Sequence, residues 1–164
     1  MLLVSVNDFV FPYSIPNADR IGALNDLMIV KQDEVLNKIF GVDFTQAFYT
    51  GLQAPSPEQR WLDLRDGKTF TLYSKTVVYP GIKSVIVPYV FAKYVREMTA
   101  NFTGIGTVRP DAENATVISA AHVEVKAYNE AVDASRIVQD YVVSDGRYSG
   151  YDICPLCYMN VFGL

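Results

Sequence analysis

The sequence predicts a mainly α-helical protein: a small helical bundle of two long and two short helices, with a small β-hairpin insert and an extended C-terminal arm. Three observations lead to this fold class. Apolar residues recur three or four positions apart over long segments, which is the period of one face of an α-helix. A β-branched and aromatic segment, residues 68–79, interrupts these helical segments. The residues after 146 are rich in aromatic side chains and show no period.

The first part of the chain contains segments with helical patterns and clear ends. Residues 18–40 hold no proline, and Gly41 suits the left-handed position that ends a helix. A short helix is predicted over residues 44–52, after which Ala54-Pro55-Ser56-Pro57 breaks the chain. A further short helix then extends through Leu64.

The β-rich insert, residues 68–79, is predicted to form a hairpin with its corner at Ser74-Lys75. After it, apolar residues spaced by four run from Ile82 to Phe102, which predicts a helix buried on most sides at the centre of the fold. Pro88 removes one backbone hydrogen bond from this helix, so we expect a kink near residues 84–88.

The last part of the bundle is predicted to be a loop followed by a long helix. Residues 103–111 contain two glycines and a proline, which favour a loop. A helix with a seam of small residues is predicted from about Glu113 to Val143. The chain is therefore divided into a helical domain, residues 1–146, and a C-terminal arm, residues 147–164.

The composition excludes several classes of protein. The 164 residues include 14 Lys+Arg and 18 Asp+Glu, for a net charge of −4, whereas a nucleic-acid binder that relies on charge needs a basic surface. The longest uncharged apolar stretch, residues 85–92, is shorter than the ~20 residues that cross a bilayer. The first residues lack the basic start of a signal peptide. We therefore expect an acidic globular protein that does not associate with membranes.

Cys154 and Cys157 form the one conventional motif, Cys-x-x-Cys. Such a pair can supply half of a zinc site or a redox dithiol. A structural zinc needs four ligands, and beyond these two cysteines the chain offers one histidine, His122. We expect two packed or idle thiols, with a zinc shared between subunits as the main alternative. No catalytic residue and no cofactor is predicted.

The aromatic residues of the C-terminal arm are expected to be covered by some protein surface. They include Tyr148, Tyr151, Tyr158 and Phe162. An arm this apolar either folds back on its own helices or docks on another chain. The sequence leaves both alternatives open.

Two stretches of the sequence carry a resemblance to a known family. The first is Val35-Leu36-Asn37-Lys38-Ile39-Phe40-Gly41-Val42-Asp43-Phe44. The second starts at Pro80-Gly81-Ile82-Lys83, runs through Glu97 and continues into residues 103–109 and the helix over residues 120–141. Together they resemble the head–tail connector (adaptor) proteins of tailed bacteriophages, over most of residues 17–143.

The resemblance implies a non-enzymatic helical bundle that forms a ring, usually dodecameric, beneath the portal of the phage head. Its implied partners are the portal protein, copies of itself and the downstream tail or stopper ring protein, while DNA passes through the channel without specific binding. It would lie at the head–tail interface of the virion, and in the host cytoplasm during assembly. The predicted partner-binding residues lie in the loop and the arm: Thr103, Gly104, Gly106, Arg109, Arg147, Tyr148, Tyr151, Tyr158 and Phe162.

Two other functions remain open. One is a tail-terminator or second-tier ring protein of the tail. The other, of a different class, is a small zinc- or thiol-dependent regulatory or redox protein that uses Cys154 and Cys157. If the connector hypothesis holds, deletion of residues 147–164 is expected to leave the bundle folded and to abolish assembly on the portal.

Overall fold

The structure, a computed structural model, describes residues 1–15, 21–99, 101–103, 106–108 and 120–160. It is mainly α-helical, as the sequence predicts. Its elements in chain order are the 3₁₀ turn η1 (Val6–Asp8), α1 (Ile21–Gln53), α2 (Gln59–Asp66), β1 (Lys68–Leu72), β2 (Lys75–Tyr79), α3 (Lys83–Thr99), β3 (Asn101–Thr103), β4 (Gly106–Val108), α4 (Ala120–Ser144) and the 3₁₀ turn η3 (Gly146–Tyr148).

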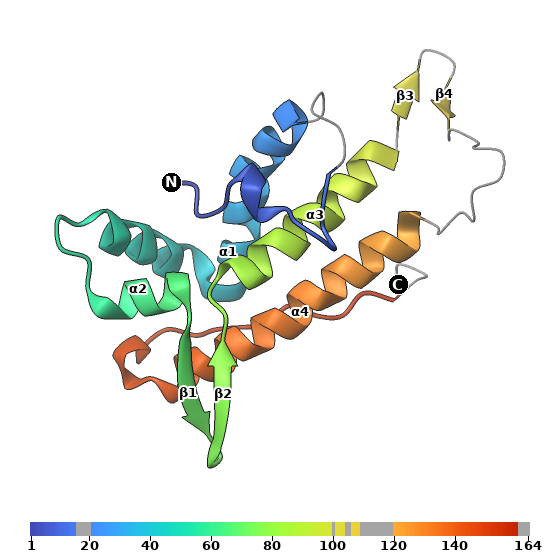
Figure 1. Cartoon of the computed structure of the whole chain (residues 1–164). Helices are drawn as coiled ribbons and strands as arrows, with labels where there is room; N and C mark the ends of the chain where they lie inside the picture. The colour runs from blue at the N-terminus through green and yellow to red at the C-terminus, as the bar shows by residue number, and fades with distance from the viewer. Residues whose placement is uncertain (16–20, 100, 104–105, 109–119, 161–164) are drawn as a thin grey trace.

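Helices α3 and α4 lie side by side and form the centre of the molecule (Figure 1). On α3, Ile86 and Val90 are fully buried, and on α4 so are Ala131 and Val138. The small side chains on α4 let the two backbones approach closely, as the predicted seam requires. Helix α3 runs through Pro88, whose ring removes one backbone hydrogen bond.

Helix α1 consists of two helical segments that meet at Gly41. This residue has φ 77° and ψ 166°, which is not helical backbone. Thr45 Oγ1 donates a hydrogen bond of 2.8 Å to the Gly41 carbonyl and so supports the break. The predicted end of one helix at Gly41 and start of another just after it are therefore confirmed.

Strands β1 and β2 form the predicted antiparallel hairpin, with Lys68 opposite Tyr79 and Leu72 opposite Lys75. The predicted corner at Ser74-Lys75 is wrong by one residue, because the turn is made by Tyr73 and Ser74. Both have positive φ, 46° and 62°, as the central residues of a type I′ turn must. The hairpin is attached to the body through the ring of Tyr79, which stacks on Tyr141 of α4 at 4.9 Å.

The identity of the turn residues gives a first prediction. Replacing Tyr73 by Asn and Ser74 by Gly is expected to stabilise the protein by about 1 kcal/mol, since Asn-Gly adopts positive φ without strain. The measurement is urea-induced unfolding, compared with a Ser56→Gly control in the loop before α2. A double variant that is less stable than the wild type would contradict this account of the turn.

Strands β3 and β4 form a second, shorter antiparallel hairpin, with Asn101 opposite Val108 and Thr103 opposite Gly106. The prediction of a plain loop from residue 103 is therefore wrong, and so is the extension of the central helix to Phe102, because α3 ends at Thr99. β-branched residues favour paired strands in this segment. Gly104, Arg109 and the predicted helix start at residues 113–119 lie outside the described residues.

The two hairpins lie at opposite ends of the α3–α4 pair (Figure 1). The β1–β2 hairpin precedes α3, and the β3–β4 hairpin connects the far end of α3 towards α4. The body thus carries one β projection at each end.

Candidate interaction surfaces

The C-terminal tail, residues 149–160, packs on the chain's own helices. The Leu156 N–H donates to Ser135 Oγ of α4 at 3.0 Å, and the Cys154 N–H donates to the Ile39 carbonyl of α1 at 3.0 Å. The Leu156 side chain is buried. Of the two alternatives that the sequence leaves open, folding back on the protein's own helices is the one observed for the described part of the arm.

The tail runs antiparallel to α4 as extended chain. Gln139 Nε2 donates to the Ile153 carbonyl at 3.3 Å, and Asn129 exchanges two hydrogen bonds of 2.9 Å with the Met159 backbone. The helix segment between these anchors spans about 15 Å at 1.5 Å per residue. The tail residues that cover it therefore advance roughly 2.5 Å each, far more than helical chain does.

The two cysteines of the Cys-x-x-Cys motif lie on this packed tail as free thiols. Cys154 and Cys157 are both exposed and do not form a disulfide with each other.

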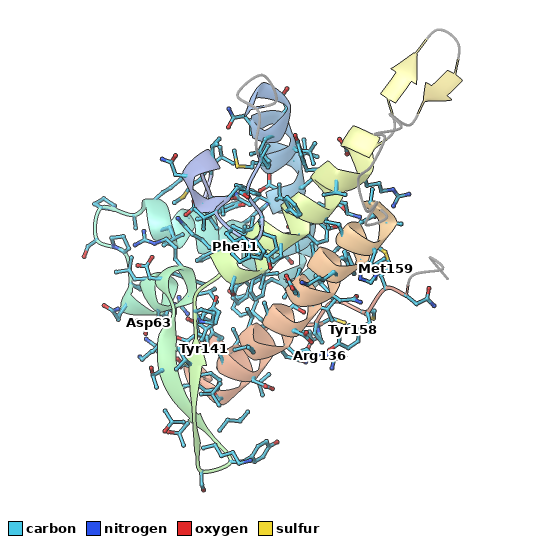
Figure 2. The ribbon with its side chains drawn as sticks, turned by 45° about the vertical axis from the view of Figure 1, so that its right-hand side comes forward. Phe11, Asp63, Arg136, Tyr141, Tyr158 and Met159 are labelled. Carbon is cyan, nitrogen blue, oxygen red and sulfur yellow. The ribbon has the colours of Figure 1, made fainter. Side chains whose placement is uncertain are left out.

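The outer surface of the tail is fixed by a tyrosine. The Tyr158 hydroxyl donates a hydrogen bond to Asp133, and the Arg136 guanidinium stacks on the Tyr158 ring at 4.4 Å. Figure 2 shows Tyr158 beside Arg136 on α4, with Met159 further along the tail. Tyr158 remains 51% exposed, so its outer face is available to a partner.

A charged cluster joins the start of the tail to α2 and to the β1–β2 hairpin. The Arg147 guanidinium donates to Asp145 at 2.5 Å and to Asp63 at 2.8 Å. Asp63, which is 7% exposed, also accepts hydrogen bonds from Lys68 at 2.8 Å and from Gln59 at 2.7 Å. Figure 2 shows Asp63 near the base of the hairpin.

The cluster keeps Asp63 ionised. Burial alone would raise the pKa of Asp63, but hydrogen bonds from Gln59, Lys68 and Arg147 outweigh it and lower this pKa from 3.8 to about 2. Because the folded-state pKa is the lower one, the carboxylate stabilises the fold above pH 4, and this contribution is lost as the pH falls from about 4 to 2.

We predict the size of this pH dependence. The wild type should lose about 2 kcal/mol of unfolding free energy from Asp63 between pH 4 and pH 2. Asp63→Asn should be less stable at pH 7 and should show a smaller loss over the same range. Urea unfolding at four pH values measures this change in unfolding free energy. Asp140→Asn, at an exposed position, is the control. Equal slopes for the wild type and Asp63→Asn would refute the assignment.

Tyr148, one of the predicted partner-binding residues, is buried in the core of its own chain. It is 2% exposed, its hydroxyl donates to the Arg60 carbonyl at 2.5 Å, and its ring lies against Phe44 and Trp61. The predicted division at residues 146 and 147 therefore cuts through η3 and the hydrophobic core. The predicted arm starts inside the body, because the Tyr148 ring fills space between α1, α2 and α4.

The other predicted partner-binding residues do not form one surface. Tyr151 is 37% exposed and its ring meets Phe44 edge-on at 4.6 Å, while Arg147 is held in the charged cluster. Thr103 and Gly106 lie in β3 and β4, at the other end of the α3–α4 pair (Figure 1). Gly104, Arg109 and Phe162 lie outside the described residues.

The sequence reasoning missed the most exposed apolar side chains. Tyr73 at the tip of the β1–β2 hairpin and Phe11 in the N-terminal segment are each 90% exposed, followed by Val143 on α4 at 74% and Val78 on β2 at 65%. The outward position of Val78 follows from the two-residue alternation of a strand, so the signal was present in the sequence. The exposure of Phe11 had no local signal.

A shallow pocket of about 280 Å³ lies between the N-terminal segment, α3 and α4. Tyr13, whose hydroxyl donates to Glu130, and Phe91 form part of its wall, with exposed His122 at the rim.

Across the part of the chain that the structure describes, no three His, Cys, Asp or Glu side chains lie close enough to bind a metal ion together. Within that same part, no helix has the length and apolar character needed to cross a membrane.

Comparison with protein families places most of the chain in a known family model. The model of DUF6712, described as a family of unknown function, matches residues 36–144. These residues include the second half of α1, both hairpins and the α3–α4 pair. No curated protein and no solved structure matches the chain.

Proposed function

The chain belongs to DUF6712, a family of unknown function, and from this premise we propose that it is a structural virion protein, a head–tail connector (adaptor) that forms a ring beneath the phage portal. One observation carries the proposal: a helical body bears a β projection at each end of its central helix pair (Figure 1). A ring subunit must offer a contact on one side and accept it on another. Two separated projections suit that requirement.

The exposed side chains support contact with other proteins. Tyr73, Phe11 and Val78 are large and apolar and are left in solvent by the fold of the single chain. Aromatic residues of this kind are enriched at the centres of protein interfaces. The proposed partners are the portal, neighbouring copies and the next ring of the tail.

The charge of the chain supports a DNA channel that does not retain DNA. A net charge of −4 gives little counterion-release attraction for a duplex that passes through the ring. The proposed location is the head–tail interface of the virion.

The experiment is co-sedimentation with portal rings from the same phage. The protein is expected to move with the portal rings in a glycerol gradient, at a stoichiometry set by the ring symmetry. Serum albumin in place of the protein is the control. If the protein stays at the top of the gradient at saturating concentration but binds purified tail tubes, the tail-terminator alternative replaces the connector.

The zinc or thiol alternative has its own test. Cys154 and Cys157 are exposed free thiols that do not pair with each other in the packed tail. A zinc shared between chains would still use these exposed thiols. Elemental analysis of the purified protein is expected to find no zinc, and stoichiometric zinc that is lost in Cys154→Ser would favour this alternative.

A further inference from the structure

We propose that the tip of the β1–β2 hairpin of one copy docks on an exposed face of α1 in the next copy. The hairpin tip is defined by Tyr73, Ser74 and Lys75. The receiving face is formed by Asp26, Ile29, Val30 and Asp33. This inference deepens the proposed ring and rests on it, because it names the two surfaces through which neighbouring copies meet.

The hairpin tip displays an aromatic side chain in a backbone conformation that does not favour it. Tyr73 has φ 46°, where Asn, Asp or Gly are the usual residues, and its side chain is 90% exposed. Tyr73 therefore strains the backbone of the turn, and its side chain gains no burial within its own chain. A backbone outlier of this kind is a reason to look for a function at that residue, and an exposed tyrosine at the tip of a projection is well placed as an interface anchor.

The charge of the hairpin differs from that of the rest of the chain. Residues 68–79 contain two basic residues, Lys68 and Lys75, and no acidic residue, in a protein of net charge −4. Lys68 is bound to Asp63 of its own copy, which leaves the exposed Lys75 as the cation of the tip. The remainder of the chain is more acidic than the whole, so a second copy offers a surface of complementary charge.

The receiving face lies on the first half of α1. Ile29 and Val30 are 54% and 60% exposed, although they are aliphatic residues of a helix. Asp26 and Asp33 lie one turn before and one turn after them and are also exposed. The four residues have the spacing i, i+3, i+4, i+7, so they share one side of the helix. The face thus has an apolar centre for the Tyr73 ring and acidic edges for Lys75.

The two surfaces lie at opposite ends of the molecule. In Figure 1 the β1–β2 hairpin points away from the end at which α1 begins. A tip therefore cannot reach the α1 face of its own chain and can only reach that of another copy. Such a head-to-tail contact repeats from copy to copy and closes into a ring when the rotation per copy allows it.

The test is self-association of the full-length protein by sedimentation equilibrium, over a wide concentration range at low and at high salt. The wild type is expected to associate, with a dissociation constant that rises with salt because the Lys75 contact is exposed. Tyr73→Asn combined with Ser74→Gly is expected to weaken association at least tenfold while the melting temperature stays the same or rises. This variant therefore separates loss of docking from loss of folding.

A charge-reversal pair identifies the receiving face. Lys75→Glu is expected to weaken association about tenfold, and adding Asp26→Lys in the same chain should restore it to within threefold of the wild type. Lys126→Glu on α4, an exposed residue with the same charge change, is the control and should leave association unchanged.

Three outcomes would overturn the inference: a wild type that stays monomeric at every concentration, a Tyr73 variant that associates like the wild type, or a charge pair without rescue. The result is separable from the proposed function. A protein that associates through the hairpin but ignores portal rings would refute the connector and leave this contact standing. If the Tyr73 variant still assembles into complete rings on the portal, the connector proposal stands and this contact is refuted.

Discussion

Tyr148→Ala is expected to lose about 3–5 kcal/mol of unfolding free energy, the range measured when large buried aromatic side chains are truncated. The side chain is 2% exposed, and its ring lies 6.1 Å from those of Phe44 and Trp61 and 5.9 Å from that of Tyr141. Alanine would leave a cavity where α1, α2 and α4 meet. It would also remove the hydroxyl that donates to the Arg60 carbonyl.

Urea unfolding measures this loss, and the tail supplies the matched control. Tyr158 is in the same tail but is 51% exposed, so Tyr158→Ala is expected to cost less than about 1 kcal/mol. Similar stabilities for the two variants would show that the start of the tail is not part of the core. Deletion of residues 147–164 is accordingly expected to unfold the bundle, which replaces the earlier expectation that the bundle would survive it.

Gly67→Ala is the second substitution with a large expected effect, a loss of about 3 kcal/mol or more. Gly67 connects α2 to β1 and has φ 98°, a backbone angle that residues other than glycine rarely adopt. A Cβ atom there would lie 2.4 Å from the Tyr79 carbonyl oxygen and 2.7 Å from the Gly81 nitrogen. Both contacts are with backbone, so neither can be relieved by a side-chain rotation.

Gly146→Ala is the control for this substitution. A Cβ atom at Gly146 meets nothing within 4 Å, and its loss of stability is expected to stay below about 1 kcal/mol. Thermal unfolding of both variants checks the difference. If Gly67→Ala is as stable as Gly146→Ala, the base of the hairpin opens easily and the hairpin is not held rigidly on the body.

The helices and the first hairpin could be predicted because their patterns are local. The four-residue spacing predicts α3 alone, and the β-branched residues of 68–79 predict the β1–β2 hairpin alone. The corner of the hairpin was placed one residue too late, since Tyr73 and Ser74 are unusual in a type I′ turn. That same anomaly is what points to a role for Tyr73.

The tail could not be placed from the sequence for a physical reason. Its backbone is anchored by side chains far away in the chain, such as Asn129 and Ser135, and extended chain held in this way needs no repeating pattern. The β3–β4 hairpin was missed because strands of three residues are too short to show alternation. The candidate partner-binding residues depended on both segments. Tyr148 is buried in the core, and Gly104, Arg109 and Phe162 lie outside the described residues.

Negative-stain images of the protein mixed with portal rings test the central claim most directly, because they report assembly itself. We predict side-view averages in which a second ring lies on one face of the portal, and end-on averages that keep a single rotational symmetry. Bare portals in the presence of excess folded protein would contradict the claim that this chain acts through contacts with its own copies and with the phage head.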